Sequence, residues 1–150
     1  MTTKQSINEF LAQKNIAIAG VSRKKQKFGN TIYKELNKKG YTLYPINPNM
    51  DEYNGKKCYP DIASLPDDVT GIVLNTNPTI TKNLIEQAEN KGINHIWLQQ
   101  GSADKNILES IEERNANIVS KQCVIMFAEP ANGIHSFHKW INKTFGLLPK

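Results

Sequence analysis

The chain has 150 residues, enough for one domain with a sizeable hydrophobic core and too few for two ordinary domains. Hydrophobic residues make up 39% and charged residues 22% of the sequence, which excludes disordered and fibrous proteins. Two cysteines and the absence of any long apolar run exclude disulfide scaffolds, paired-cysteine zinc sites and membrane spans. We therefore expect a cytoplasmic protein with no membrane partner.

The net charge is +5, and its placement is uneven. Residues 23–39 contain seven cations and one anion, Glu35, so this segment carries +6 and the remainder of the chain carries −1. One compact cationic segment favours a local anionic group, whereas a nucleic-acid partner would favour cations spread over a whole face. The competing interpretation is an ordinary solvated, lysine-rich helix and its leading loop.

Apolar runs and turn residues alternate along the first half of the chain. The predicted elements there are, in order, a short helix capped by Ser6, a strand at 15–20, a helix at 29–39, a strand at 41–46, a short strand at 56–59 and a single helical turn at 61–66. Pro45 cannot donate a ladder hydrogen bond, so it must lie at the end or on the unpaired side of its strand.

The second half repeats the pattern, with a predicted strand at 70–75, a helix at 80–91 stopped by Gly92, a strand at 93–98, a helix at 104–115 and a strand at 117–120. Helices of this length are crossover connections, which place the strands parallel and the helices on both faces. The predicted fold is a Rossmann-like, doubly wound three-layer α/β/α domain with a mostly parallel sheet of five or six strands. We expect a single domain over 1–150 with its core at about 14–125. A closing helix at about 134–145 would pack on the sheet layer or on a second subunit, so a monomer and a homodimer both stay open.

Ligands of doubly wound sheets bind beyond the carboxyl ends of the strands, where the strand order reverses. The predicted ends are residues 20–29, 47–49, 75–78 and 99–102 and the turn near Cys123. The first of these loops is the most informative, because a helix N-terminus favours anions and residues 22–27 add one hydroxyl and four cations. The loop lacks the glycine pattern of dinucleotide-binding proteins, and no acidic residue follows the second strand, which argues against NAD. The loop suits a ligand with more phosphate charge than one pyrophosphate.

The order and spacing of several segments resemble the CoA-binding protein family, whose Rossmann-like domain is similar to the amino-terminal domain of the succinyl-CoA synthetase α subunit. The segments that carry the resemblance are residues 16–23, 27–29, 40–48, Gly55 with 58–60, 64–66, Pro78 and 97–101. The resemblance implies binding of coenzyme A or an acyl-CoA. Because the phosphohistidine loop, the partner ligase domain and the ATP-grasp segment are absent from this sequence, we expect binding without catalysis.

The resemblance also implies which residues hold the ligand. They are the phosphate loop of Gly20, Val21, Ser22, Arg23, Lys27, Phe28 and Gly29; the adenosine side of Asn47, Pro48 and Asn49; Thr76, Asn77 and Pro78 after the fourth strand; and Gln99, Gly101 and the residue between them along the pantetheine arm. Met50 stands where the synthetase carries a ligand-contacting lysine, so phosphate recognition would shift to residues 23–27 or to Lys56 and Lys57. Arg23 is the predicted partner of the 3′-phosphate, since its planar fork meets phosphate oxygens bidentately.

Other interpretations of individual residues stay open. An NADP-dependent oxidoreductase or redox sensor is the alternative function, because Arg23 would equally meet a 2′-phosphate. Cys123 is either inert packing or a thiol that forms a mixed disulfide with CoA. His135 and His138 have a spacing that brings two imidazoles together on a helix, but no third ligand is visible, so we expect no metal site. We also expect no active site, because Ser22 is not in a G-x-S-x-G elbow and the adjacent carboxylates at 67–68 and 112–113 diverge in direction.

Overall fold

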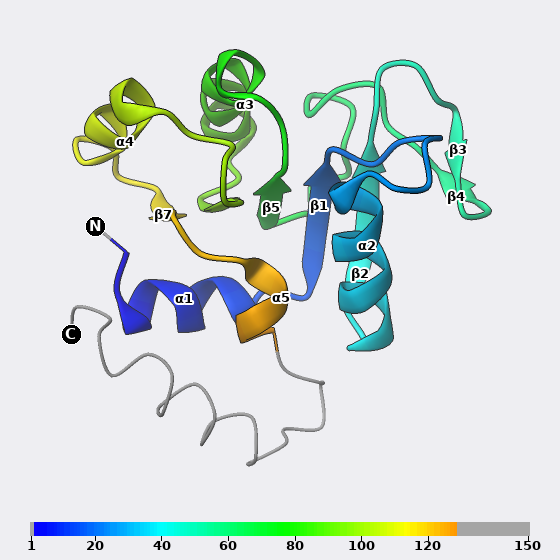
Figure 1. Ribbon diagram of the computed structural model, residues 1–150, viewed down its shortest axis with the longest axis horizontal. Helices are drawn as coiled ribbons and strands as arrows, with labels where there is room; N and C mark the ends of the chain where they lie inside the picture. The colour runs from blue at the N-terminus through cyan, green and yellow to red at the C-terminus, as the bar shows by residue number, and fades with distance from the viewer. Residues whose placement is uncertain (1, 129–150) are drawn as a thin grey trace.

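A computed structural model describes residues 2–128. Its central sheet has five strands, all parallel, in the order β2-β1-β5-β6-β7 (Figure 1). The strands are β1 (Asn15–Ala19), β2 (Thr42–Ile46), β5 (Gly71–Leu74), β6 (His95–Leu98) and β7 (Asn117–Val119). The helices are α1 (Lys4–Leu11), α2 (Phe28–Lys38), α3 (Pro78–Lys91), α4 (Lys105–Ile111) and α5 (Val124–Phe127). The predicted Rossmann-like α/β fold is confirmed.

Side chains on alternate strand positions face two separate helix layers, as the pleat requires. In β1, Ile16 and Ile18 pack in the core under α1, α2 and α5, whereas Ala17 and Ala19 pack in the core under α3 and α4. Trp97 of β6 anchors the first layer, with its ring centroid 5.2 Å from that of Phe10 in an edge-to-face contact. The buried indole Nε1 donates to the Gln122 carbonyl at 2.9 Å, so this large side chain is both packed and satisfied.

The edge strand β2 explains how a proline fits in the sheet. Pro45 is aligned with Ile18 of β1, and its carbonyl accepts a 2.8 Å hydrogen bond from the Tyr59 amide on the outer side of β2. Its missing N–H therefore removes no bond between β1 and β2.

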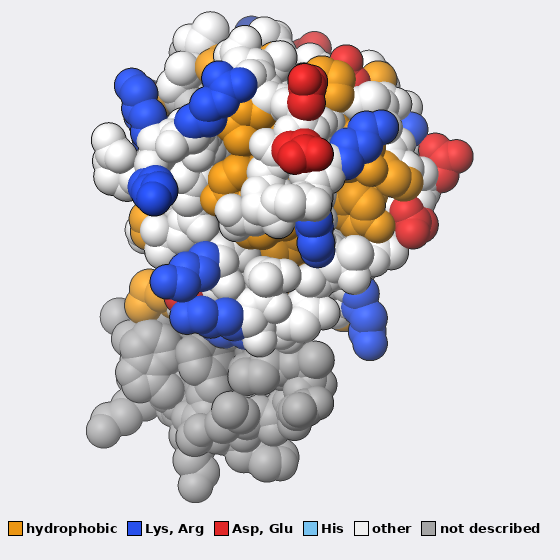
Figure 2. All heavy atoms as spheres, turned by 90° about the vertical axis from the view of Figure 1, so that its right-hand side faces the viewer, with side chains coloured by type: hydrophobic (Ala, Val, Ile, Leu, Met, Phe, Trp, Pro, Cys, Tyr) orange, Lys and Arg blue, Asp and Glu red, His pale blue; other side chains and the backbone are white. Residues whose placement is uncertain are grey.

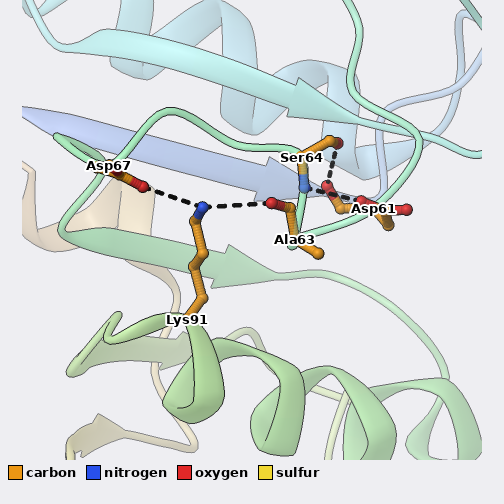
Figure 3. Close-up of polar contacts among 5 residues, drawn as sticks. All are labelled: Asp61, Ala63, Ser64, Asp67 and Lys91. Carbon is orange, nitrogen blue, oxygen red and sulfur yellow. Dashed lines mark hydrogen bonds and ion pairs between the residues drawn. The ribbon is translucent and has the colours of Figure 1, made fainter.

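Two predictions in the segment between β2 and β5 are confirmed only in part. Of the short strand predicted at 56–59, Lys56–Lys57 forms β4, which pairs antiparallel with β3 (Glu52–Tyr53) in a separate hairpin turned by Asn54 and Gly55, and Tyr59 alone forms a parallel bridge to Ile46 of the main sheet. Residues 61–66 contain one turn, closed by a 3.1 Å hydrogen bond from the Leu65 amide to the Ile62 carbonyl, and no longer helix. The Asp61 carboxylate accepts from the Ser64 amide at 2.9 Å, and Lys91 of α3 donates to the Ala63 carbonyl and to Asp67, each at 3.2 Å (Figure 3). These side-chain bonds hold the segment in place around its single backbone turn bond.

Several element boundaries differ from the prediction because caps set them. Thr3, and not the predicted Ser6, is the N-cap of α1. The Ser6 amide donates to the Thr3 hydroxyl at 3.0 Å, and the Thr3 amide donates to the Ser6 hydroxyl at 2.8 Å, which together form a capping box. Helix α3 begins at Pro78 instead of residue 80, because Asn77 caps it. Helix α4 ends at Ile111, and α5 is an element the sequence did not predict.

Residues 134–145, with His135 and His138, lie outside the described residues, and the structure does not test the closing helix predicted there. Within residues 2–128, every helix is too short or too polar to cross a bilayer.

Candidate functional site

The strand order reverses between β1 and β5. From β1 the chain passes through α2 to β2 on one side, and it later returns to β5 on the other side of β1. Helices α2 and α3, which follow β1 and β5, cover opposite faces of the sheet, so their starts diverge there. A cleft of about 440 Å³ opens at this switch point, beyond the carboxyl ends of β1, β5 and β6.

The cleft is of a size that suits a small molecule or part of a cofactor. Its lining residues come from three strand ends: Gly20, Ser22, Lys27 and Phe28 after β1; Asn75, Thr76 and Asn77 after β5; and Gln100, Gly101 and Ser102 after β6. Lys27 supplies a positive charge, and no acidic residue is among them.

Two glycines allow the start of α2 to touch the end of β1. A Cβ at Gly29 would lie 2.5 Å from the Gly20 carbonyl carbon and 3.1 Å from the Val21 nitrogen, both closer than ordinary contact. Gly20 itself has φ +119°, a conformation that side chains rarely adopt. The pair therefore brings the first turn of α2 directly against the strand end that lines the cleft.

The N-terminus of α2 carries no side-chain cap at Lys27, whereas Thr3, Asn77 and Asp104 cap α1, α3 and α4. The amide groups of a first helical turn need partners outside the helix. At α2, where Lys27 and Phe28 line the cleft, the Lys27 side chain makes no capping hydrogen bond, and the Asn30 amide bonds to the Lys27 carbonyl at 3.1 Å. The uncapped turn favours an anion.

Asn30 holds the β1–α2 loop in shape. Its carbonyl oxygen accepts from the Ser22 amide at 2.8 Å, and its amide nitrogen donates to the Ser22 carbonyl at 2.8 Å and to the Lys24 carbonyl at 3.0 Å. The Ser22 hydroxyl oxygen in turn accepts from the Lys24 amide at 3.1 Å. The predicted phosphate loop is thus pre-formed around one side chain that the sequence analysis did not single out.

The predicted adenosine segment lies beside this loop and is tied to it. Asn47 donates to the Val21 carbonyl at 2.8 Å, and the exposed Arg23 donates to the Asn49 carbonyl at 2.7 Å. Asn49 also donates its amide to the Asn47 side chain at 2.8 Å. The ends of β1 and β2 therefore form one rigid unit next to the cleft, with the Arg23 guanidinium beside the end of β2.

Gln99 is placed differently from the expectation that it borders the ligand. It is only 2% exposed, and its amide donates to the Cys123 sulfur at 3.1 Å and accepts from the Val124 amide at 3.1 Å. Its side chain therefore serves the start of α5. The carbonyl of Gln99 accepts from the Ser102 hydroxyl, so its backbone still shapes the cleft loop.

Seven of the fifteen residues implied by the resemblance line the cleft: Gly20, Ser22, Lys27, Phe28, Thr76, Asn77 and Gly101. The other eight do not line it: Val21, Arg23, Gly29, Asn47, Pro48, Asn49, Pro78 and Gln99. Asn75 and Ser102 line it, although the sequence analysis placed them only within the strand ends. Lys56 and Lys57 lie on the exposed hairpin, and Met50 is buried in the core. The cleft is therefore built from the predicted loops with a shifted set of side chains.

The two thiols differ in surroundings. Burial raises the pKa of the Cys58 thiol, and the nearby Asp51 carboxylate raises it further. Cys123 is half-buried against Gln99. Within residues 2–128, no three histidine, cysteine or acidic side chains come close enough to hold a metal ion.

Comparison with known sequences settles which family these loops come from. The sequence profile of the family described as CoA binding domain matches residues 14–129. The chain belongs to the CoA binding domain family. The predicted membership is confirmed.

Similar proteins fall into two groups by length. The ADP-forming acetate–CoA ligase of Methanocaldococcus jannaschii is 29% identical over 143 residues, which cover 90% of this chain and 19% of the ligase. This chain thus spans about one fifth of the length of that ligase. A conserved hypothetical protein from Pyrococcus furiosus matches with a TM-score of 0.71 and 33% identity, over 75% of this chain and 97% of that one.

A second similar structure contains bound molecules. It is the dinucleotide-forming acetyl-coenzyme A synthetase 1 of Korarchaeum cryptofilum in complex with phosphate and ADP, with a TM-score of 0.63 and 25% identity. The match covers 70% of this chain and 24% of the synthetase.

Proposed function

We propose that this chain binds coenzyme A or an acyl-CoA in the switch-point cleft, with the phosphates at the β1–α2 loop, and that it catalyses no reaction by itself. The observation that carries the proposal is the uncapped start of α2, pressed against Gly20 and flanked by Ser22 and Lys27, in a member of the CoA binding domain family. These groups supply backbone amides, a hydroxyl and a cation for phosphate oxygens.

The charge of the loop matches such a ligand. Arg23, Lys24, Lys25 and Lys27 are all exposed in the loop before α2. A nucleotide with one pyrophosphate and one phosphate monoester carries roughly four negative charges. On the face that carries α2 and the hairpin, basic side chains stand at separate places, with uncharged surface or acidic side chains between them (Figure 2). That distribution supports a small anionic ligand over a nucleic acid, which would need a continuous basic surface.

The orientation of the ligand follows from which cleft segments carry positive charge. The cleft segments after β5 and β6, residues 75–77 and 99–102, contain no charged residue. The phosphates therefore belong at the β1–α2 side, and the uncharged pantetheine arm belongs along the ends of β5 and β6.

Binding without catalysis is supported by the chemistry of the lining. Among the described residues, the cleft is lined by hydroxyls and Lys27 but by no carboxylate, imidazole or thiol, so it lacks the His–carboxylate or Cys–His pair that commonly activates a nucleophile. The ligase that resembles this chain is about five times as long, so most of the ligase, with the further residues that its reaction uses, lies outside the matched segment.

An NADP-dependent oxidoreductase or redox sensor is the second candidate. It is favoured by Arg23, whose bond to the Asn49 carbonyl holds its guanidinium at the end of β2, where a 2′-phosphate is recognised in dinucleotide-binding folds. A fluorescence titration in which NADPH binds more tightly than CoA would favour this candidate.

Titration calorimetry with CoA and dephospho-CoA tests the phosphate assignment. Because a charge-assisted contact is worth roughly 1.5–3 kcal/mol, we expect CoA to bind about tenfold or more tightly than dephospho-CoA. Arg23→Gln should remove most of that difference, while Lys14→Gln, at an exposed lysine beside the amino end of β1, should leave it intact. Equal affinities of the unmodified protein for both ligands would contradict a 3′-phosphate site.

A further inference from the structure

The cleft wall opposite α2 contains two hydroxyl groups whose hydrogens are donated to other atoms of the protein. Thr76 after β5 and Ser102 after β6 line this wall. Behind Thr76 lies Thr81 of α3, whose exposed fraction is 0%. Thr81 is a polar side chain outside the cleft, and its only polar neighbours given by the structure belong to Thr76.

Each hydroxyl has one hydrogen to donate, so the two contacts between these threonines determine each other. The Thr81 oxygen lies 3.2 Å from the Thr76 carbonyl oxygen, which can only accept, so Thr81 is the donor of that bond. The two hydroxyl oxygens are 2.7 Å apart, a hydrogen-bond distance. With the Thr81 hydrogen committed to the carbonyl, the hydrogen between the hydroxyls belongs to Thr76. The Thr76 oxygen then presents only lone pairs to the cleft.

Ser102 is arranged in the same way. Its hydroxyl donates to the Gln99 carbonyl at 2.5 Å, and the residue is 2% exposed. The side of its oxygen that faces the cleft can therefore accept a hydrogen bond and cannot donate one. These two hydroxyls thus accept hydrogen bonds, while the side-chain amides of Asn75, Asn77 and Gln100 on the same wall also carry N–H donors.

We propose that Thr81 is a positioning residue that fixes the Thr76 hydroxyl as an acceptor for an N–H donor of the ligand arm. The inference rests on the proposed function, in which the arm along β5 and β6 is pantetheine, whose two amide groups carry N–H donors.

The test compares CoA with adenosine 3′,5′-bisphosphate, which keeps the base and two phosphates and lacks the pantetheine arm. Thr81→Val preserves the side-chain shape and frees the Thr76 hydrogen to point into the cleft. We expect the affinity for CoA to fall about fivefold and the affinity for the bisphosphate to stay unchanged. Thr81→Ser keeps the hydroxyl and should bind CoA like the unmodified protein. Thr42→Val makes the same chemical change at an exposed site at the start of β2 and should alter neither affinity.

A variant of the partly exposed lining residue covers the case in which Thr81→Val does not fold. Thr76→Val deletes the acceptor itself and should weaken CoA binding without changing bisphosphate binding. The inference is overturned if neither variant changes CoA binding, or if CoA and bisphosphate lose affinity equally, since the latter would place the N–H donor on the adenine or indicate general damage. If the unmodified protein binds the bisphosphate as tightly as CoA, this inference fails while the phosphate loop stands. If it binds neither ligand, the proposed function fails, and this inference fails with it.

Discussion

Replacing Gly29 by alanine perturbs the contact on which the phosphate loop depends. The added Cβ would lie 2.5 Å from the Gly20 carbonyl carbon, where ordinary contact begins at 3.4 Å. Both partners are backbone, so no side-chain rotation relieves the overlap, and the start of α2 must retreat by at least about 0.9 Å, the difference of those distances. Such a displacement moves the first-turn amides away from any phosphate bound at Ser22 and Lys27.

The expected magnitudes follow from that displacement. Overpacking costs about 1–3 kcal/mol, and the better helix propensity of alanine offsets up to about 1 kcal/mol. The free energy of unfolding should therefore fall by roughly 1–2 kcal/mol, which lowers Tm by about 2–8 °C in a chain of this size. The loss of one charge-assisted amide–phosphate bond should weaken CoA binding by about tenfold or more.

Denaturant unfolding and titration calorimetry measure the two effects, and Gly71→Ala is the matched control. A Cβ at Gly71 would meet Ile16 at 3.4 Å and Gln13 at 3.5 Å, which are ordinary contacts, and Gly71 begins β5 at the sheet end away from the cleft. This control should bind CoA normally. If Gly29→Ala matched the unmodified protein in both unfolding midpoint and CoA affinity, the close approach of α2 to β1 would have no role in binding.

Three further predictions concern single side chains. Asn30→Ala removes three hydrogen bonds from the phosphate loop and should weaken CoA binding about tenfold by calorimetry, while Asn37→Ala at the exposed end of α2 should not. Burial raises the pKa of the Cys58 thiol above its ordinary value of 9.0, so less thiolate is present near neutral pH, and Ellman's reagent should label Cys123 well before Cys58 in the folded protein. Burial also raises the pKa of Tyr33 above 10.0, and its hydroxyl has no partner among the described residues, so Tyr33→Phe should stabilise the fold by about 1 kcal/mol.

The raised pKa values of Cys58 and Tyr33 lower the stability of the fold at alkaline pH. For both Cys58 and Tyr33 the pKa is higher in the folded state than in the unfolded state. Their stabilising contribution is fully present below pH 9 and is lost as pH rises through the folded values, because the unfolded chain releases these protons first. Denaturant midpoints should fall above pH 9, less steeply in Tyr33→Phe. Equal labelling rates of the two cysteines, an unchanged Asn30→Ala, or a steeper alkaline loss in Tyr33→Phe would each contradict the corresponding reasoning.

The main sheet was predictable because its strands are buried on both faces and separated by amphipathic helices, which leaves strong periodic signals. The segment at 52–66 was not, because its structure depends on two-residue ladders and on the bonds of Asp61 and Lys91, which have no period. The early start of α3 and the capping box of α1 follow from cap residues that lie outside the apolar pattern.

The cleft is built from the loops named in the sequence analysis, while its lining side chains differ in part from the predicted ones. The strand–loop–helix pattern placed Gly20 and Gly29 at the switch point, yet Asn30 was missed because a polar residue in the first turn of a helix gives no signal of a bond to the preceding loop. Gln99 was misplaced for a simpler reason. Trp97 faces the α1–α2–α5 layer and Leu98 faces the other, so the alternation carries Gln99 back toward α5 and away from the cleft.

The central claim is that the start of α2 holds the phosphates of CoA. A two-dimensional NMR titration of the backbone amides with CoA tests it most directly. We expect the largest shifts at Phe28 and Gly29, smaller shifts at Thr76 and Gly101, and none at Thr42 at the opposite end of the sheet. Saturation with CoA that left the amides of Phe28 and Gly29 unmoved, or that shifted the Thr42 end of the sheet instead, would contradict it.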